Sequence, residues 1–438
     1  MQSVWITLPV DIVIKIAFAV PDAAGLLAFL KVLRPYNVLG PLEHLFRLSL
    51  THKVWDLWPC LRLAPSTLGS TEQSSYEFIA KYYVKVLVGP GWNDVEWLKA
   101  HLNPMAKVAW HIKDLPSTTE IADDWFDLQI PELRLSSMPN ALLRWKDLLP
   151  RLQYLSSLAI YTDSNNLEDL FELVAKSKHI IDFNIVAPYH RMTASDVVYL
   201  TKWFQEQPVR EFLWCLKDLG VMDSGLKQDF YEAMFNCPTL DRLELSGFEL
   251  DDVNFTHLTF AMKSLCLQFC LESSQVVKSM SNRLESSNIA NLELTAYYDD
   301  DLDEIECLLN TLPCTSIKHL KLSLMPIDNS PTWCCLALLF EKCTLETLTL
   351  EIDNLCSAFF QSLATAIQNN HTICELDLSW SAIAVEDLKL LIESMTMPSR
   401  QVRTKRVSIL SSSLQGMEPS TVENLTELAK ERGGEFLY

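Results

Sequence analysis

The sequence predicts an α/β solenoid: a horseshoe in which short units of one parallel strand and one helix stack behind a small N-terminal helical unit. Three observations predict this fold. A six-residue string, [Ile/Leu]-x-x-Leu-x-Leu, recurs along the chain, and its last four copies are evenly spaced. Segments with apolar residues at helical spacing lie between the copies. Glycine makes up only 11 of 438 residues, which favours helices over a barrel built from tight turns.

The first forty residues, 1–40, are expected to form the small helical unit. Its apolar residues lie on two helical stripes, Leu8, Ile12 and Ile16 on the first helix and Leu26, Leu27 and Leu30 on the second. Pro9 suits the start of the first helix, and Asp22 is a good N-cap for the second. Residues 41–56 are then expected to form a connecting helix.

The repeats follow, over residues 57–415. In the four evenly spaced copies the last leucines are Leu294, Leu322, Leu350 and Leu378, so the three intervals between them are equal. The helices expected beside these strands are 273–284, 302–312, 330–343 and 355–371. One strand-and-helix unit cannot cover its own apolar face, but stacked units bury a continuous ribbon of leucines.

A looser form of the string, with any large apolar residue in the third position, extends the array in both directions. Its third positions are Leu63, Val88, Trp110, Leu135, Ile160, Ile185, Trp214, Leu245, Leu267 and Ile409. The spacing of these positions is uneven, which is typical of a degenerate array. Residues 416–438 are expected to form a last helix and a short strand that cap the open end.

These repeats resemble the leucine-rich-repeat family, in particular the subclass with full helices and units of about 28 residues, as in ribonuclease inhibitor. The resemblance covers most of residues 57–415 and implies a concave sheet with helices outside it. Members of the family usually carry Asn or Cys three residues after the last strand leucine, where the side chain bonds the turn backbone. Among the residues at this position only Cys270 fits, so we expect an irregular solenoid.

The N-terminal pattern Leu-Pro-x-Asp-x-x-x-x-Ile, followed by a Pro-Asp turn and Leu-Leu, resembles an F-box. The resemblance implies a substrate receptor that docks on a Skp-type adaptor of a cullin ubiquitin ligase and holds a target protein on its repeats. The adaptor contacts would be Leu8, Pro9, Ile12, Ile16, Leu26 and Leu27. The Val-Cys-(Arg/Lys)-x-Trp segment that usually closes an F-box is replaced by VLRPYNVLG at 32–40. The alternative is a scaffold or inhibitor whose N-terminal helices only cap the first repeat.

Candidate partner-binding residues lie between the last two leucines of each strand, because alternate strand residues face opposite sides of a sheet. They are Glu244, Cys266, Glu293, Lys321, Thr349 and Asp377. This predicted surface is polar and modestly acidic, which suits a protein partner.

Catalysis is not expected. The nine histidines fall in no metalloprotease or nucleophile signature, and the sequence has no glycine-rich phosphate loop or metal-ligand spacing, so we expect no cofactor or metal. The formal charge of 36 − 56 = −20 argues against nucleic acids and membrane surfaces as partners. The twelve cysteines form no CxxC pair, and several fall in apolar patterns, which predicts buried thiols in the cytoplasm or nucleus.

Overall fold

The computed structural model divides into two compact units, Met1–Ala187 and Pro188–Tyr438. It describes residues 9–67, 69–92, 94–113, 124–136, 148–220, 222–247, 250, 253–270, 274–298, 303–326, 332–352, 355–379, 383–402, 404–409 and 417–438. Each unit is built from strands that pair in parallel with their neighbours in chain order. Among the described residues, no helix combines the length and apolar character needed to cross a bilayer.

The first unit begins with a bundle of short helices. They are α1 (Val10–Ala19), α2 (Ala23–Leu33), α3 (Leu42–Thr51) and α4 (Val54–Leu57). Asp22 caps α2 as predicted, because its Oδ1 accepts a hydrogen bond from the Gly25 N–H at 2.7 Å. Val13, Ala17 and Leu30 are fully buried and form the centre of the bundle.

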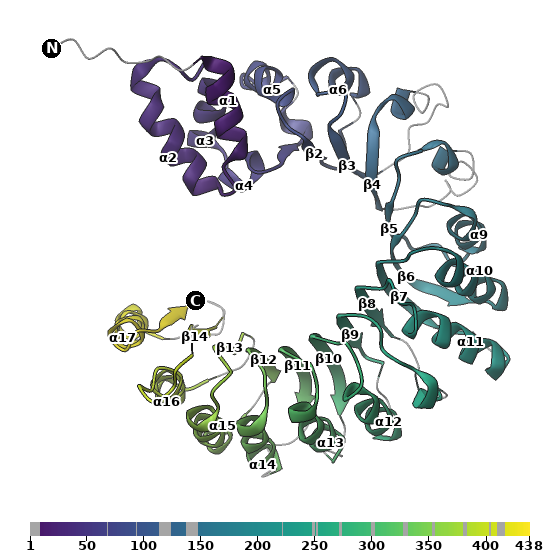
Figure 1. Ribbon diagram of the computed structural model, residues 1–438, viewed down its shortest axis with the longest axis vertical. Coiled ribbons are helices and arrows are strands. Elements are labelled where there is room, and N and C mark those ends of the chain that lie inside the picture. Colours follow the sequence, from purple (N-terminus) through teal and green to yellow (C-terminus); the bar gives the residue numbers. More distant parts are fainter. Residues whose placement is uncertain are drawn as a thin grey trace. The chain divides into compact units, whose positions relative to one another are not determined.

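The rest of the first unit alternates strands with helices. The strands are β1 (Leu61–Leu63), β2 (Lys85–Val88), β3 (Lys107–Ile112), β4 (Gln129–Ser136), β5 (Ser157–Tyr161) and β6 (Asp182–Met192), which runs on into the second unit. The helices are α5 (Gln73–Ala80), α6 (Val95–His101) and α9 (Glu168–Lys176). Figure 1 shows α5, α6 and α9 on one side of these strands.

One sequence prediction in this unit is wrong by two residues. The spacing equates Trp110 with Leu135, but Trp110 pairs with Leu133, and Leu135 pairs with Ile112. The offset between β3 and β4 also changes along the strands, because Lys107 pairs with Gln129 whereas Ala109 pairs with Glu132. Because the shift is two residues, Leu133 and Leu135 both keep their apolar side chains in the core.

The second unit contains the regular repeats. Its strands are β7 (Glu211–Leu219), β8 (Arg242–Ser246), β9 (Ser264–Gln268), β10 (Asn291–Tyr298), β11 (His319–Pro326), β12 (Thr347–Ile352), β13 (Glu375–Asp377), β14 (Arg406–Ser408) and β15 (Glu435–Leu437). Its helices are α10 (Ala194–Glu206), α11 (Ser224–Phe235), α12 (Ser274–Leu284), α13 (Asp303–Thr311), α14 (Thr332–Leu339), α15 (Ser357–Asn369), α16 (Val385–Met395) and α17 (Pro419–Glu431). Within this unit the strands line the inside of an arc and the helices lie outside it (Figure 1).

The predicted ribbon of leucines is present. Leu292, Leu320, Leu348 and Leu376 pair with one another in parallel register, and each is at most 1% exposed. The predicted helices 273–284, 302–312, 330–343 and 355–371 correspond to α12, α13, α14 and α15, although α14 gives way to a 3₁₀ turn at Phe340–Lys342. The last helix and the short terminal strand are also confirmed, as α17 and β15.

Side chains form hydrogen bonds with the turn backbone both after a strand, at Cys270, and between a helix and the next strand, at Asn370. Cys270, the one residue that fits the family pattern after a strand, is fully buried, and its Sγ donates to the Leu245 carbonyl at 3.3 Å. A second turn, between α15 and β13, is held by Asn370, which no pattern predicted. Its Nδ2 donates to the carbonyls of Phe340 and Cys343 at 2.9 Å each, in the preceding repeat.

The same turn is bound from the next repeat by Arg400, whose side chain is 1% exposed. Its Nε donates to the Asn370 carbonyl at 3.0 Å, its Nη1 to the Met395 carbonyl at 3.1 Å, and its Nη2 to the Ile373 carbonyl. Burial lowers the pKa of Arg400 to about 10, so the guanidinium stays charged at neutral pH and its charge is distributed over backbone acceptors.

Candidate protein-interaction surface

The predicted concave residues form one continuous row across the second unit. In the parallel register Glu244 pairs with Cys266, Cys266 with Glu293, Glu293 with Lys321, Lys321 with Thr349, and Thr349 with Asp377. Each lies between the buried leucines of its own strand. The sequence therefore predicted the positions of these residues correctly, while their role in binding remains a prediction.

Lys321 is the electrostatic centre of the row. Its Nζ lies 2.9 Å from the Glu293 carboxylate and 3.2 Å from the Glu351 carboxylate of the next strand. Partial burial opposes the charge, but the hydrogen bonds and charges of these two carboxylates raise the pKa of Lys321 above its ordinary value. One cation thus bridges three successive strands.

We expect Lys321→Met to lower the free energy of unfolding by less than about 1 kcal/mol, since the three side chains are partly solvated. Lys263→Met, which removes a more exposed lysine paired with Asp241, is the matched control and should have a smaller effect. Denaturant unfolding at low and high salt checks this, because salt should reduce the difference between the two variants. A loss above about 2 kcal/mol that salt does not change would contradict a surface ion network.

Cys266 is the one apolar point in this row. It is 5% exposed between Glu244 and Glu293. Burial, followed by the charges of these carboxylates, raises the pKa of the Cys266 thiol to about 12. The thiol is therefore protonated at neutral pH and contributes a small, weakly polar contact rather than a nucleophile.

The N-terminal candidates are divided between the surface and the core. Ile12 and Ile16 are 40% and 41% exposed on one side of α1, and Pro9, at its start, is exposed as well. Leu27 is half-buried, whereas Leu26 is 1% exposed and belongs to the core of the bundle. Leu8 lies outside the described residues.

The strands of the second unit decide the fold. From β10 to β13 the leucines repeat at equal steps along the chain, stay in parallel register, and are buried beneath helices that each follow a strand. The fold is a leucine-rich-repeat solenoid. Fold and repeats agree with protein binding, because a solenoid presents a long, regular surface.

One comparison with a known protein, a partial sequence match, agrees with these repeats. No family model matches the chain. Over 186 residues it is 26% identical to NACHT, LRR and PYD domains-containing protein 12 of Homo sapiens, a match that covers 41% of this chain and only 15% of that relative's length. The solved structure of a leucine-rich-repeat protein of Leptospira interrogans aligns over 86% of this chain and 95% of its own, with 12% identity and a TM-score of 0.32. That likeness is too low to bear on fold or function.

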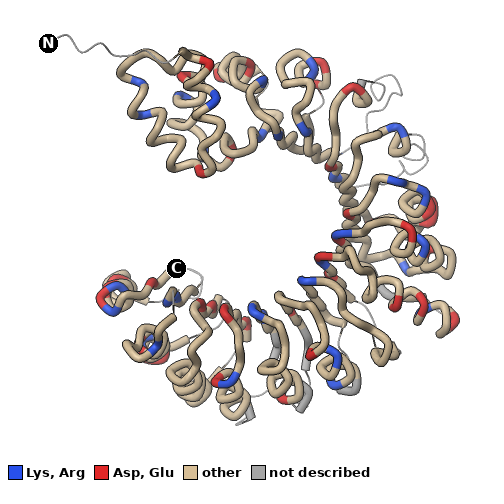
Figure 2. The backbone as a smooth tube through the Cα atoms, viewed as in Figure 1, with Lys and Arg blue, Asp and Glu red and all other residues tan. Residues whose placement is uncertain are grey.

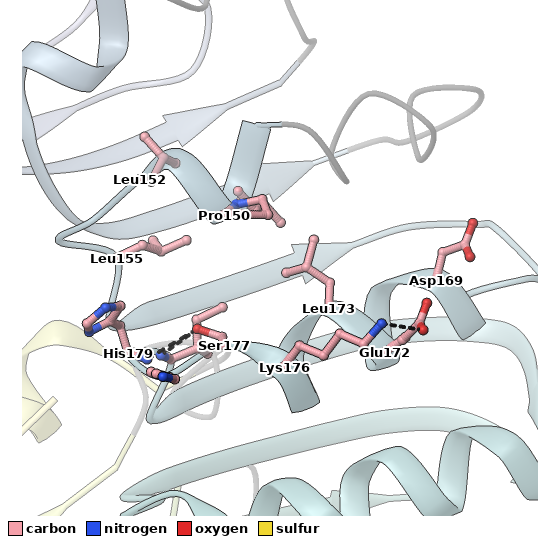
Figure 3. A pocket seen from close by; sticks show the side chains of 12 residues that line it. Pro150, Leu152, Leu155, Asp169, Glu172, Leu173, Lys176, Ser177 and His179 are labelled. Carbon is pink, nitrogen blue, oxygen red and sulfur yellow. Dashed lines mark hydrogen bonds and ion pairs between the residues drawn. The ribbon is translucent and has the colours of Figure 1, made fainter.

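One groove of the solenoid lies on its helical side, between α9 and the turn at 149–155. It has a volume of about 380 Å³ and is lined by Pro150, Leu155 and Leu173 with polar groups at its edge (Figure 3). Lys176 Nζ lies 2.6 Å from the Glu172 carboxylate, and Ser177 Oγ accepts from the His179 N–H at 3.2 Å. These polar groups serve local structure, so the groove offers apolar contact rather than reactive chemistry.

A second groove, of about 550 Å³, crosses the sheet face at β1–β4 in the first unit. Arg62, His111 and Arg134 line it, and sequence reasoning did not single them out. The same alternation that located Glu293 and Lys321 applies to these strands. The outward positions could not be aligned from the sequence, because the spacing there is uneven and the register shifts between β3 and β4.

Proposed function

We propose that this protein is a substrate receptor of a cullin ubiquitin ligase: its N-terminal helices dock on a Skp-type adaptor, and its solenoid holds a target protein. It would supply proximity, and the ubiquitin chemistry would lie in other subunits. A cytoplasmic or nuclear site of action accords with the free thiols packed in its core, such as Cys237 and Cys343.

The observation that carries the docking proposal is the exposure of Ile12 and Ile16. They lie one turn apart on the outer side of α1, while Val13 and Ala17, about 100° further around the helix, are fully buried. Covering the exposed parts of these two apolar side chains, about 40% of each, would let a partner recover roughly 1 kcal/mol for each chain. A docking helix on an adaptor would use such a stripe.

The alternative, a scaffold or inhibitor whose helices only cap the solenoid, is favoured by a different residue of α1. Phe18 packs edge-on against Trp58 and Tyr83, with ring centroids 5.1 and 5.0 Å apart, and so attaches α1 to the first repeat. The indole N–H of Trp58 also donates to the Val20 carbonyl at 3.2 Å. Capping accounts for these contacts, but it does not explain why Ile12 and Ile16 are exposed.

We expect Ile12→Asp combined with Ile16→Asp to weaken binding to a purified Skp-type adaptor by at least about tenfold, because charge replaces apolar contact at the centre of the interface. Val84→Asp, at an apolar residue that is 69% exposed elsewhere in the unit, is the matched control and should bind as the natural chain does. Biolayer interferometry with immobilised adaptor measures both affinities, and circular dichroism checks that each variant is folded.

Two results would sink the docking proposal. One is a full-length chain that does not bind the adaptor. The other is an equal loss of affinity in the Val84→Asp control. Either result leaves the capping alternative, in which the row from Glu244 to Asp377 would still hold a partner protein.

A further inference from the structure

The groove at β1–β4 exists because small residues occupy positions at which the neighbouring strands carry long side chains. Arg62, Leu87, Ala109 and Glu132 pair across one row of the sheet face. Ala109 leaves a gap in this row, and Gly89, which also lines the groove, leaves another beyond the end of β2. A Cβ on Gly89 would lie 3.1 Å from the Leu63 carbonyl oxygen, so this position stays small.

The charge of these strands is opposite to that of the chain as a whole. Strands β1–β4 carry four cations, Arg62, Lys85, Lys107 and Arg134, against a single carboxylate, Glu132. By contrast, β8–β15 carry three cations against six carboxylates, and the whole chain has a formal charge of −20. Figure 2 shows the blue positions along the first strands of the sheet. The groove itself is lined by two arginines, Arg62 and Arg134, and two carboxylates, Asp56 and Glu132. The excess of positive charge on this sheet face comes from Lys85 and Lys107, which pair with each other in the adjoining row of the same strands.

The two arginines keep hydrogen-bonding capacity for a ligand. Arg134 bonds one oxygen of Glu132 through Nε and Nη2, at 3.0 and 2.9 Å, while Arg62 lies 3.7 Å from the Asp56 carboxylate. Their side chains are 56% and 57% exposed. A guanidinium has five N–H donors, which is more than one carboxylate oxygen can accept.

His111 contributes to the groove without adding charge at neutral pH. Burial, followed by the neighbouring charge of Arg134, lowers the pKa of His111. Its Nε2 lies 2.6 Å from the Ser136 hydroxyl, which fixes the ring at the wall of the groove. The positive charge of this sheet face therefore comes from the two arginines of the groove and from the lysines of the adjoining row.

We propose that this groove binds an acidic peptide segment of a partner protein, with Asp or Glu carboxylates seated on Arg62 and Arg134. The inference rests on the proposed role of the solenoid in holding a target and names the chemistry of that target. A short acidic peptide fits better than a nucleic acid, because a long polyanion would extend beyond the groove onto the acidic remainder of the chain.

The test uses a fluorescein-labelled hexaglutamate peptide and the full chain in a fluorescence-anisotropy titration. The peptide should bind, and a hexaglutamine peptide should not. Arg62→Gln combined with Arg134→Gln should weaken binding by about tenfold, because two charge-assisted contacts are lost. Arg242→Gln is the matched control, since Arg242 makes the same kind of pair with Glu244 at 2.9 Å and is 55% exposed. It should change the affinity by less than about twofold.

Three outcomes would overturn the proposal: no binding of hexaglutamate, an equal loss in the Arg242→Gln control, or an oligothymidylate that binds as tightly as the peptide. Adaptor affinity, measured on the same variants, separates this inference from the docking proposal. If the double variant loses peptide binding but keeps its affinity for the adaptor, the result supports the groove and says nothing about docking. A chain that binds the peptide but not the adaptor contradicts docking and leaves the groove standing.

Discussion

Arg400→Met is expected to destabilise the C-terminal repeats by about 4 kcal/mol, the largest effect of any single change considered for this protein. The guanidinium donates to the carbonyls of Asn370, Met395 and Ile373 in an almost fully buried place. Methionine fills much of the volume but donates nothing, so buried carbonyls lose their donor at roughly 1–3 kcal/mol each, partly recovered by relaxation.

The change is best measured by hydrogen exchange with mass spectrometry, because repeat proteins open in parts and one unfolding midpoint does not describe them. Amides of α15, β13 and α16 should exchange faster, and those of the first unit should not change. The matched control is Arg432→Met, at an arginine that is 42% exposed and 3.5 Å from Glu393, where a change of at most about 0.5 kcal/mol is expected. Equal effects in the two variants would mean that the carbonyls of Asn370, Met395 and Ile373 form hydrogen bonds with water when the guanidinium is absent.

Asn370→Leu should cost about 3 kcal/mol, because a side chain of similar size loses both its donors and its acceptor. The amide nitrogen donates to Phe340 and Cys343, and the amide oxygen accepts from the N–H groups of Thr372 and Ile373 at 2.8 Å each. Leucine leaves all four backbone groups without this partner inside the core.

The adjacent residue supplies the control. Asn369→Leu changes the same residue type in the same way on the exposed side of α15, so its effect should lie within about 0.5 kcal/mol. The same exchange experiment compares the two variants. If Asn370→Leu exchanged no faster than Asn369→Leu, the turn would be held by packing rather than by the Asn370 amide.

The regular part of the fold could be predicted because it depends on local pattern. Leucines at equal steps along the chain determine which side chains of β10–β13 enter the core, and the alternation of strand residues then places Glu293 and Lys321 outside. No knowledge of distant contacts is needed for this step. The positions of the predicted interaction row were therefore accessible from the sequence.

The remaining features depend on contacts between residues far apart in the chain. Asn370 and Arg400 match no pattern, because their partners are backbone carbonyls that come close only when the repeats stack. The groove at β1–β4 stayed hidden because the pairing of Trp110 with Leu133 breaks the spacing that would align its outward residues. Exposure of Ile12 beside burial of Leu26 also depends on how the helices of the bundle pack, which periodicity alone does not specify.

The equal steps from β10 to β13 have a consequence for how the length of this chain can change. Asn291, His319, Thr347 and Glu375 occupy the same register position and follow one another at a constant interval. If a block of that length is duplicated or deleted, each strand still meets its new neighbour in the same pairing register. The number of repeats can therefore change without disrupting the sheet. Around Lys107 and Glu132 the steps are unequal, so insertion or deletion of a block of the same size would leave the neighbouring strands out of register. The part of the chain from β10 to β13 is thus modular in length, and the part around β3 and β4 is not.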